Sequence, residues 1–196
     1  MKPRTATKQR KTNETEIRLR LNLDGDGQHN ISTGIPFFDH MLAQLARHGR
    51  MDLEIDARGD LEVDGHHTVE DVGLTLGQAL NEALGERRGI TRFGHAYVPL
   101  DEALSRVVVD FSGRPYLIYR VNFETPHLGD LQTELIEEFF KAVVQEGRLN
   151  LHIENIYGRN QHHIAETLFK ATARALRVAT RVEFADGDIP STKGVL

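Results

Sequence analysis

Two patterns of apolar and polar residues recur along the chain, one with the period of a strand and one with the period of a helix. Alternation with period two predicts half-buried strands at 16–23, 51–56, 105–112, 116–123 and 149–154. The turn signal Asp24-Gly25-Asp26-Gly27 predicts a hairpin after the first of them, with residues 28–33 returning antiparallel.

Apolar residues at helical spacing predict four helices, at about 37–46, 66–84, 131–145 and 162–178. Gly49 and Gly85 follow the first two segments and fit the position at which a helix stops, because glycine adopts the left-handed conformation without strain. Strands and helices therefore occur in the same order in the two parts of the chain.

The order of elements is accompanied by a residue-level match. The segment 48–55 (HGRMDLEI) aligns without a gap on 146–153 (EGRLNLHI), and His66-His67 aligns on His162-His163. This indicates an internal duplication. We expect an α+β fold with two sheet-plus-helices halves related by a pseudo-twofold axis. The expected organisation is a disordered basic tail at 1–11 and one domain at 12–196, with repeats at about 12–92 and 93–184 and a C-terminal substrate-binding tail at 185–196.

Composition excludes several classes of protein. The 196 residues include no Cys, so disulfides, thiolate metal sites and a cysteine nucleophile are excluded. The formal net charge of −5 argues against a nucleic-acid binder. No apolar stretch reaches the roughly 18 residues of a membrane span. The basic start lacks the apolar segment of a signal peptide, so we expect a cytoplasmic location.

Candidate chemistry concentrates in two histidine-rich units. His66 and Glu70 are four residues apart on a predicted helix, as are His162 and Glu166, so each pair shares one face and can bind one divalent ion. The neighbouring His67 and His163 point about 100° away round the helix and are free to serve a second ion. A single pair would be weak evidence, whereas its repetition at equivalent places is strong evidence for a metal site.

The duplication extends this ligand set. It aligns His40 with Glu138, and exchange between the halves would give two four-ligand groups, one with His66, Glu70, His163 and Glu138 and the other with His162, Glu166, His67 and His40. Such nitrogen and oxygen donors suit Mn²⁺, Zn²⁺, Fe²⁺ or Co²⁺, with Mn²⁺ first because of the carboxylates. Glu138 belongs to an acidic run and fits a solvated face equally well. Spacing leaves open whether each group closes within one chain or between subunits.

Basic and hydroxyl side chains predict an anion site. Arg92, Arg114 and Lys170 lie near elements that carry the expected ligands, and Ser191, Thr192 and Lys193 form a small clamp before Gly194 near the end of the chain. Hydroxyls, a lysine and flexible backbone can surround a phosphate. The glycine-rich patterns typical of nucleotide sites are absent from the sequence.

The ordered set of motifs resembles the imidazoleglycerol-phosphate dehydratases of histidine biosynthesis over residues 10 to 196. The segments that carry the resemblance are FDHML (38–42), DGHHTVED (64–71), RFG (92–94), GRP (113–115), His162-His163 with Glu166, and PSTKGVL (190–196). It implies a hydro-lyase that converts imidazole glycerol phosphate to imidazole acetol phosphate and water.

The resemblance also implies a cofactor, an assembly and residue roles. These are two Mn²⁺ ions per active site and a homo-oligomer of 24 subunits with sites between chains. One ion would take His40, His67, His162 and Glu166, and the other His66, Glu70 and His163. The family often has His where this chain has Glu138, which places that ligand in question. Substrate contacts would come from Glu14, His40, Gln44, His48, Arg92, Arg114, Lys170, Ser191, Thr192 and Lys193.

The chemistry explains the need for metal. Hydroxide is a poor leaving group, and the carbon proton that is lost has no adjacent carbonyl; an imidazole ring ionised to imidazolate between two metal ions could expel the hydroxyl. A carboxylate then removes the carbon proton, and Glu14, which matches a family acid–base residue, is the first candidate, with Glu70 and Glu166 as further catalytic carboxylates. Rival interpretations are a dinuclear phosphoesterase and a non-catalytic, metal-stabilised oligomer.

Overall fold

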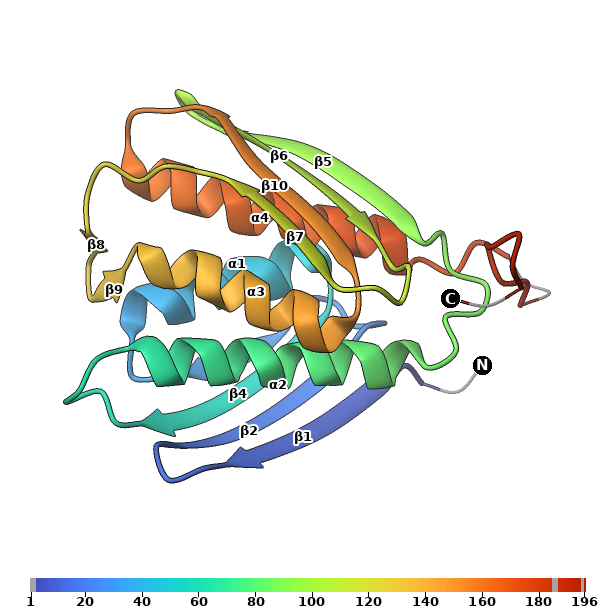
Figure 1. The fold of residues 1–196 in the computed structure, drawn as a ribbon, viewed down its shortest axis with the longest axis horizontal. Coiled ribbons are helices and arrows are strands. Elements are labelled where there is room, and N and C mark those ends of the chain that lie inside the picture. Colours follow the sequence, from blue (N-terminus) through green and yellow to red (C-terminus); the bar gives the residue numbers. More distant parts are fainter. Residues whose placement is uncertain (1–2, 185–186, 195) are drawn as a thin grey trace.

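Two four-stranded sheets enclose four helices in the computed structural model, which describes residues 3–184, 187–194 and 196 (Figure 1). The first sheet contains β1 (Thr5–Lys11), β2 (Thr15–Asn22), β3 (His29–Ser32) and β4 (Asp52–Gly59). The second contains β5 (Phe93–Leu100), β6 (Ala103–Asp110), β7 (Tyr116–Arg120) and β10 (Asn150–Tyr157). The helices are α1 (Pro36–Gly49), α2 (His66–Leu84), α3 (Glu134–Gly147) and α4 (Gln161–Thr180), and a small ribbon joins β8 (His127–Leu128) to β9 (Leu131–Gln132).

The two sheets have the same topology, which confirms the expected duplicated α+β fold. Their strand orders are β1-β2-β4-β3 and β5-β6-β10-β7. In each, a short edge strand runs parallel to the strand that follows it after a helix, as β3 does to β4 across α1 and β7 to β10 across α3. A parallel pair needs such a crossover, because a tight hairpin can join only antiparallel neighbours.

Two strand expectations in the first half were wrong. Thr5–Lys11 is not a disordered tail but the edge strand β1, paired antiparallel with β2 over its whole length. It inserts Ala6 into the core and leaves its basic side chains outside or half-buried, so its sequence lacks a clear apolar alternation. Residues 29–32 pair parallel with β4 instead of returning on β2, because β4 occupies that neighbouring position.

The second half differs in a corresponding way. β5 was not expected, and it forms an antiparallel hairpin with β6. β10 separates β6 from β7 in the sheet, so the strands on either side of the 113–115 turn are not neighbours. The apolar alternation located β6 and β7 but could not give their pairing, since pairing depends on contacts distant in the sequence.

The expected helices are confirmed, with one difference at their ends. Gly49 is the last residue of α1 and is buried; Arg50, which follows it, adopts the left-handed conformation with φ 53°. Gly147 and Arg148 repeat this arrangement after α3, with φ 50° at Arg148. A Cβ on Gly49 would lie 2.6 Å from the terminal methyl group of the flexible Met51 side chain, and the left-handed Arg50 closes the helix.

Aromatic packing joins the halves. The ring of Phe139 on α3 lies edge-on to Phe38 on α1 at 5.3 Å between centroids and stacks on Phe169 of α4 at 5.6 Å. α2 approaches α3 closely at Gly73, where an added Cβ would lie 2.7 Å from the carbonyl oxygen of Phe139. Three of the four helices therefore share one aromatic core, and the helix ends are held in fixed relation.

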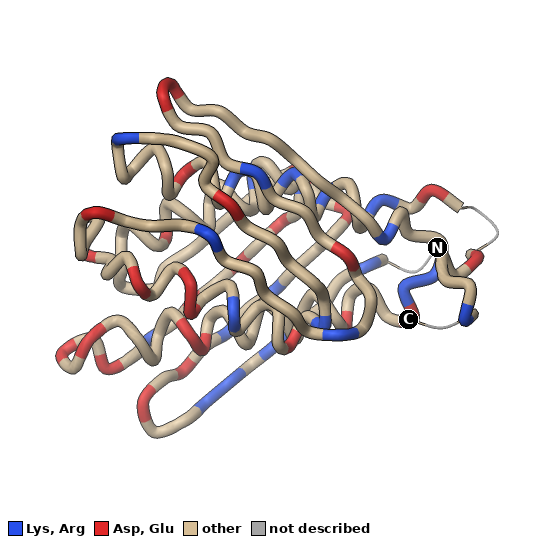
Figure 2. The backbone as a smooth tube through the Cα atoms, turned by 45° about the horizontal axis from the view of Figure 1, so that its top comes forward, with Lys and Arg blue, Asp and Glu red and all other residues tan. Residues whose placement is uncertain are grey.

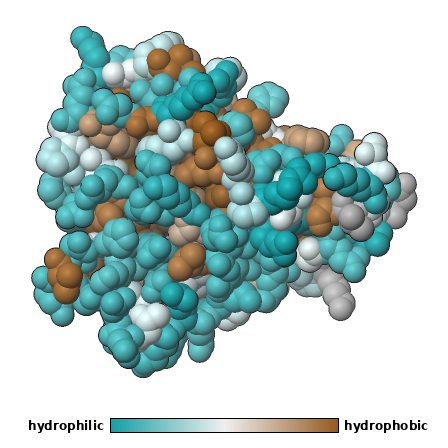
Figure 3. Space-filling view, in the orientation of Figure 1, coloured by the Kyte–Doolittle hydropathy of each residue, from teal (hydrophilic) through white to brown (hydrophobic). Residues whose placement is uncertain are grey.

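The outer faces of the two sheets differ in polarity. The face of the second sheet exposes Tyr97 and Val108, and Tyr116 begins its edge strand, while the first sheet exposes charged side chains such as Arg18 and Glu54. Figure 3 shows apolar side chains gathered over the second sheet in an otherwise polar surface. Among the described residues, no helix has the combination of length and apolar composition needed to cross a bilayer.

Candidate metal centre

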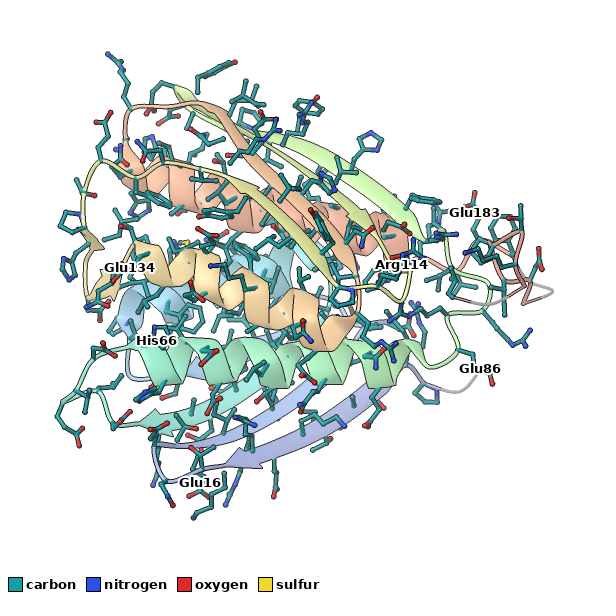
Figure 4. The ribbon with its side chains drawn as sticks, viewed as in Figure 1. Glu16, His66, Glu86, Arg114, Glu134 and Glu183 are labelled. Carbon is teal, nitrogen blue, oxygen red and sulfur yellow. The ribbon has the colours of Figure 1, made fainter. Side chains whose placement is uncertain are left out.

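The histidine pairs lie at the end of the molecule where all four helices begin. His66 starts α2 at this end, and α4 begins with Gln161 next to His162 (Figure 4). Asp and Glu positions gather in the turns here (Figure 2). Asn160 accepts hydrogen bonds from the backbone N–H groups of His162 and His163, which fixes the start of α4 and so the backbone that carries both imidazoles.

His40, His162 and Glu166 form one compact donor group. Their Nε2, Nε2 and carboxylate oxygen atoms lie within 4.8 Å of one another. His40 Nε2 is 2.9 Å and His162 Nε2 is 3.1 Å from the same oxygen, Glu166 Oε1. His40 comes from α1 of the first half and the other two from α4 of the second half. The exchange between halves that the duplication predicts is therefore present for three of the four members of that set.

Glu166 carries a full negative charge in this group. Burial opposes its ionisation, but hydrogen bonds from Lys170, His40 and His162 outweigh burial and lower the pKa of Glu166 to about 2. Lys170 lies one helical turn further along α4 and contacts the second oxygen, Oε2. Oε1 thus faces the two imidazoles, and Lys170 holds the other side of the carboxylate.

This group fits a divalent ion of borderline hardness. Two imidazole nitrogens and a carboxylate oxygen, without sulfur, are the donors that Mn²⁺, Fe²⁺, Co²⁺ and Zn²⁺ accept. Phe37 covers one side, with its ring 5.2 Å edge-on from His162 and 6.5 Å from His40. Gln44 and His48 continue along α1 in a hydrogen-bonded chain, with 3.1 Å between Gln44 Oε1 and His48 Nε2. Three donors leave further coordination positions for other ligands.

The equivalent group of the first half is looser. His66 Nε2 lies 4.0 Å from Glu70 Oε2 on α2, as the helical spacing predicts. Glu138 on α3 pairs with Lys141 Nζ at 2.8 Å on its own helix. The described contacts of Glu138 therefore place it in an ion pair, and its role as a ligand stays a prediction.

His67 and His163 do not join the group on their own helix or the expected group from the other half. Asp60 accepts from His67 Nδ1 at 3.1 Å, and Glu102 accepts from His163 Nδ1 at 2.8 Å. These acids fix the tautomer in which Nε2 lacks a proton and can bind metal, because Nδ1 carries it. The Asp60 hydrogen bond, with the charge of Glu14, raises the pKa of His67 although burial opposes it.

Asp60 and Glu102 were not among the expected site residues. A signal for Glu102 exists in the strand register: Asn22 pairs with Asp52 and Asp110 pairs with Asn150, so positions 22 and 110 are equivalent and Glu14 corresponds to Glu102. Glu102 accepts from the backbone of Arg159 and Asn160 as well as from His163, and these bonds lower its pKa to about 2.

Glu14 has far fewer partners than its counterpart. Its nearest cation is His67, whose Nε2 is 3.8 Å from Glu14 Oε1, and its side chain is 53% exposed. The duplication has therefore produced one acid that is locked in place and one that is free to move toward a ligand. A carboxylate used for proton transfer needs the second kind of environment.

The expected phosphate contacts lie elsewhere. Arg92 donates to Asp110 and to the carbonyl oxygen of Pro190, and its backbone N–H donates to Ala179 near the end of α4. The backbone of Leu196 lies next to Gly113, adjacent to Arg114, and Pro190 accepts from Arg92, so the residues on either side of Ser191, Thr192 and Lys193 contact this end of the molecule. Figure 4 places Arg114 at the end opposite to His66. Lys170 lies near the metal ligands as expected, whereas Arg92 and Arg114 do not.

Comparison with known proteins agrees with these motifs. A model of the imidazoleglycerol-phosphate dehydratase family matches residues 33–176. The dehydratase of Magnetococcus marinus is 60% identical over 98% of both chains, and that of Thioalkalivibrio sulfidiphilus is 58% identical over the full length of both.

Solved structures give the same answer. The crystal structure of imidazoleglycerol-phosphate dehydratase from Staphylococcus aureus superposes with a TM-score of 0.83 at 40% identity, covering 91% of this chain and 99% of the other. The enzyme from Pyrococcus furiosus, in complex with (S)-C348, has the same TM-score and identity over 96% and 100%. The resemblance first drawn from the motifs is confirmed: the chain belongs to the imidazoleglycerol-phosphate dehydratase family, the hydro-lyases of histidine biosynthesis.

Proposed function

We propose that this enzyme dehydrates imidazole glycerol phosphate to imidazole acetol phosphate in sites that hold two divalent metal ions, Mn²⁺ first, and that are completed by neighbouring chains. The observation that carries the proposal is the convergence of His40, His162 and Glu166, from both halves of the duplication, on one point. These three residues would hold one ion together with His67 of a neighbouring chain. His66, Glu70 and His163 would contribute to the other.

Metal ions bound there would supply Lewis acidity toward the imidazole ring of the substrate and so help the hydroxyl to leave. The protein's own groups do the rest. Asp60 and Glu102 accept from Nδ1 of His67 and His163, so each neutral ring presents its Nε2 lone pair to a metal ion. Glu14 removes the carbon proton, and the enol that remains becomes the ketone. Lys170 balances the charge of Glu166, while Gln44 and His48 line the path of the substrate along α1.

The length of α4 supports sites shared between chains. Arg92 hydrogen-bonds to Ala179, seventeen residues after His162, which corresponds to about 25 Å along the helix at 1.5 Å per residue. A substrate made of an imidazole ring, three carbons and a phosphate is much shorter than this. In one chain, therefore, His162 cannot contact the imidazole ring of a substrate while Arg92 contacts its phosphate. Two chains placed side by side can provide both contacts.

The phosphate end of the site would come from Arg92, Arg114, Ser191, Thr192 and Lys193 of a second chain. The assembly proposed is the 24-subunit particle that the family resemblance implies, and the exposed apolar side chains on the second sheet offer a surface for subunit contact (Figure 3). For an enzyme that acts on a small phosphorylated metabolite, we propose a cytoplasmic location.

The experiment that tests metal dependence follows ketone formation from imidazole glycerol phosphate after the protein has been stripped with a chelator, before and after adding counted equivalents of Mn²⁺. We expect activity to return and to level off at two ions per chain. Ketone formation by the fully stripped protein would contradict the proposal. Release of inorganic phosphate in place of ketone would identify a phosphoesterase, and an intact, metal-loaded particle without product would indicate a structural metal.

A further inference from the structure

A basic cleft lies beyond the metal centre, between the last turns of α1 and α4. It encloses about 440 Å³ and is lined by Arg47, His48 and Arg50 from the end of α1, Arg174 and Arg177 from α4, and Asp26 with Gln28 from the loop before β3. A neighbouring hollow of about 940 Å³ shares Arg50, Arg174 and Arg177 and adds Arg4 and Arg181. In a chain with a formal net charge of −5, so many arginines around one cleft are unusual.

The arginines of this cleft are only partly neutralised. Asp26 Oδ1 accepts from Arg50 Nη2 at 2.6 Å, and Asp24 pairs with Arg4. Arg47, Arg174 and Arg177 make no ion pair with an acidic side chain among the described residues, and all three are exposed. Like charges held close together repel, so an anion that enters between these arginines stabilises the group.

His48 reports the same excess of positive charge. Burial is the largest cause that lowers the pKa of His48, and the charges of Lys170 and Arg174 follow; the charge of Glu166 opposes them, and Arg47 adds a smaller lowering contribution. Arg47 belongs to α1, and Lys170 and Arg174 belong to α4, so both helices contribute positive charge next to His48. The positive potential is therefore a property of the α1–α4 pair and not of one helix end.

The cleft is separate from the metal centre. Arg174 and Arg177 follow Glu166 by eight and eleven residues on the same helix, which places them about 12 Å and 16 Å along its axis. They lie on the face that also carries Lys170, since the spacing of four and three residues keeps side chains aligned. Arg92 and Arg114 are not among the residues that line the cleft; His48 lines its edge and is the one residue that the cleft shares with the proposed path of the substrate.

We infer that this cleft is a second anion site that binds a phosphate dianion, either free inorganic phosphate or the phosphoryl group of a small monoester. The guanidinium groups of Arg174 and Arg177 provide forked donors that match phosphate oxygens in pairs. Arg47 closes the opposite wall from α1. Binding there requires no metal and no turnover, so the inference stands or falls independently of the proposed dehydratase mechanism.

The test measures phosphate binding to the metal-loaded, full-length protein by titration calorimetry at low ionic strength. One arm uses inorganic phosphate and a second uses glycerol 3-phosphate, which separates a site for the free ion from one for monoesters. The variant Arg174→Gln with Arg177→Gln removes both forks, Arg47→Gln removes the opposite wall, and Arg88→Gln is the matched control, since Arg88 pairs with Glu86 outside the cleft.

We expect the wild type and Arg88→Gln to bind one more equivalent per chain than the double variant, and Arg47→Gln to weaken that equivalent at least tenfold. Equal isotherms for all four proteins would overturn the inference. A second pair of results would also overturn it: the double variant changes particle size in light scattering, and Arg47→Gln binds phosphate as the wild type does. The cleft would then be a contact surface for a neighbouring chain. Crystals soaked with tungstate should show an anomalous peak between Arg174 and Arg177, and a peak confined to the active site would contradict the inference.

Discussion

Glu102 offers a sharp test of how the site is prepared for metal. Glu102 Oε2 accepts from His163 Nδ1 at 2.8 Å, while Oε1 accepts from the backbone N–H of Arg159 at 3.0 Å and of Asn160 at 2.6 Å. In Glu102→Gln the amide oxygen keeps the two backbone bonds, and the amide nitrogen faces the imidazole. His163 must then accept at Nδ1 and carry its proton on Nε2, the atom needed for metal.

The expected loss follows from this change of tautomer. Removal of an outer partner of a ligating histidine typically costs 10- to 100-fold in metal affinity, which is about 1.4 to 2.8 kcal/mol at 1.4 kcal/mol for each factor of ten. The effect should fall on one of the two ions, because His163 serves one. Since both backbone bonds remain, we expect the midpoint of thermal unfolding of the stripped protein to change little.

Free Mn²⁺ measured by electron paramagnetic resonance during titration gives the affinity of each site directly. Glu86→Gln is the control, since Glu86 is 77% exposed and pairs with Arg88 away from the site. Unchanged Mn²⁺ affinity and stoichiometry in Glu102→Gln would refute the reasoning. A loss equal to that of the control would do the same.

Three further predictions concern catalysis, loop stability and the core. Glu14→Gln should keep Mn²⁺ and substrate binding and lower kcat about 10²- to 10⁴-fold, as loss of a general base does; a wild-type kcat would remove Glu14 from the mechanism. Asp52→Asn should lower the free energy of unfolding by about 1–3 kcal/mol, because the amide loses the charge that strengthens the bonds from the backbone of Asp26, Gly27 and Gln28 and places an NH₂ group against the donor Asn22 Nδ2. Although burial opposes it, these bonds lower the pKa of Asp52. The contribution of Asp52 to the free energy of unfolding is therefore complete above its ordinary pKa and is lost as pH falls through the lowered pKa. Urea denaturation should accordingly give the wild type and Asp52→Asn equal stabilities in strong acid. Phe139→Ala should cost about 3–5 kcal/mol in the same assay, because its ring joins three helices, and a cost below 1 kcal/mol would contradict that role.

Local patterns were sufficient for the helices and for the duplication. The apolar spacing of residues 66–84 matches α2, and the aligned segments 48–55 and 146–153 lie at equivalent places in the two halves. Pairing was beyond the sequence where it depends on distant strands. β3 follows a turn that resembles a hairpin, yet it lies beside β4 because a helix separates them. β1 has one buried apolar residue, Ala6, which is too weak a signal for a strand.

The site shows the same division. The spacing of four residues predicted the contact between His162 and Glu166, and the duplication predicted that His40 joins them. Sequence proximity did not predict that Arg92 lies beside Ala179, nine residues beyond Lys170 on α4, since that requires the length and direction of the helix. Asp60 and Glu102 were missed because each lies in a turn that approaches its histidine only in the folded chain. The sequence does not give the position of these turns relative to the starts of α2 and α4.

Subunit complementation tests the central claim most directly. His162→Ala removes a metal ligand and Arg114→Ala removes a phosphate contact, and each homogeneous particle should be inactive. If the two residues serve one site from different chains, co-expression of both variants in mixed particles should restore roughly a quarter of wild-type ketone formation, because random pairing leaves that share of interfaces intact. Mixed particles with no activity above the single variants would show that both residues must lie on one chain, which would contradict the account.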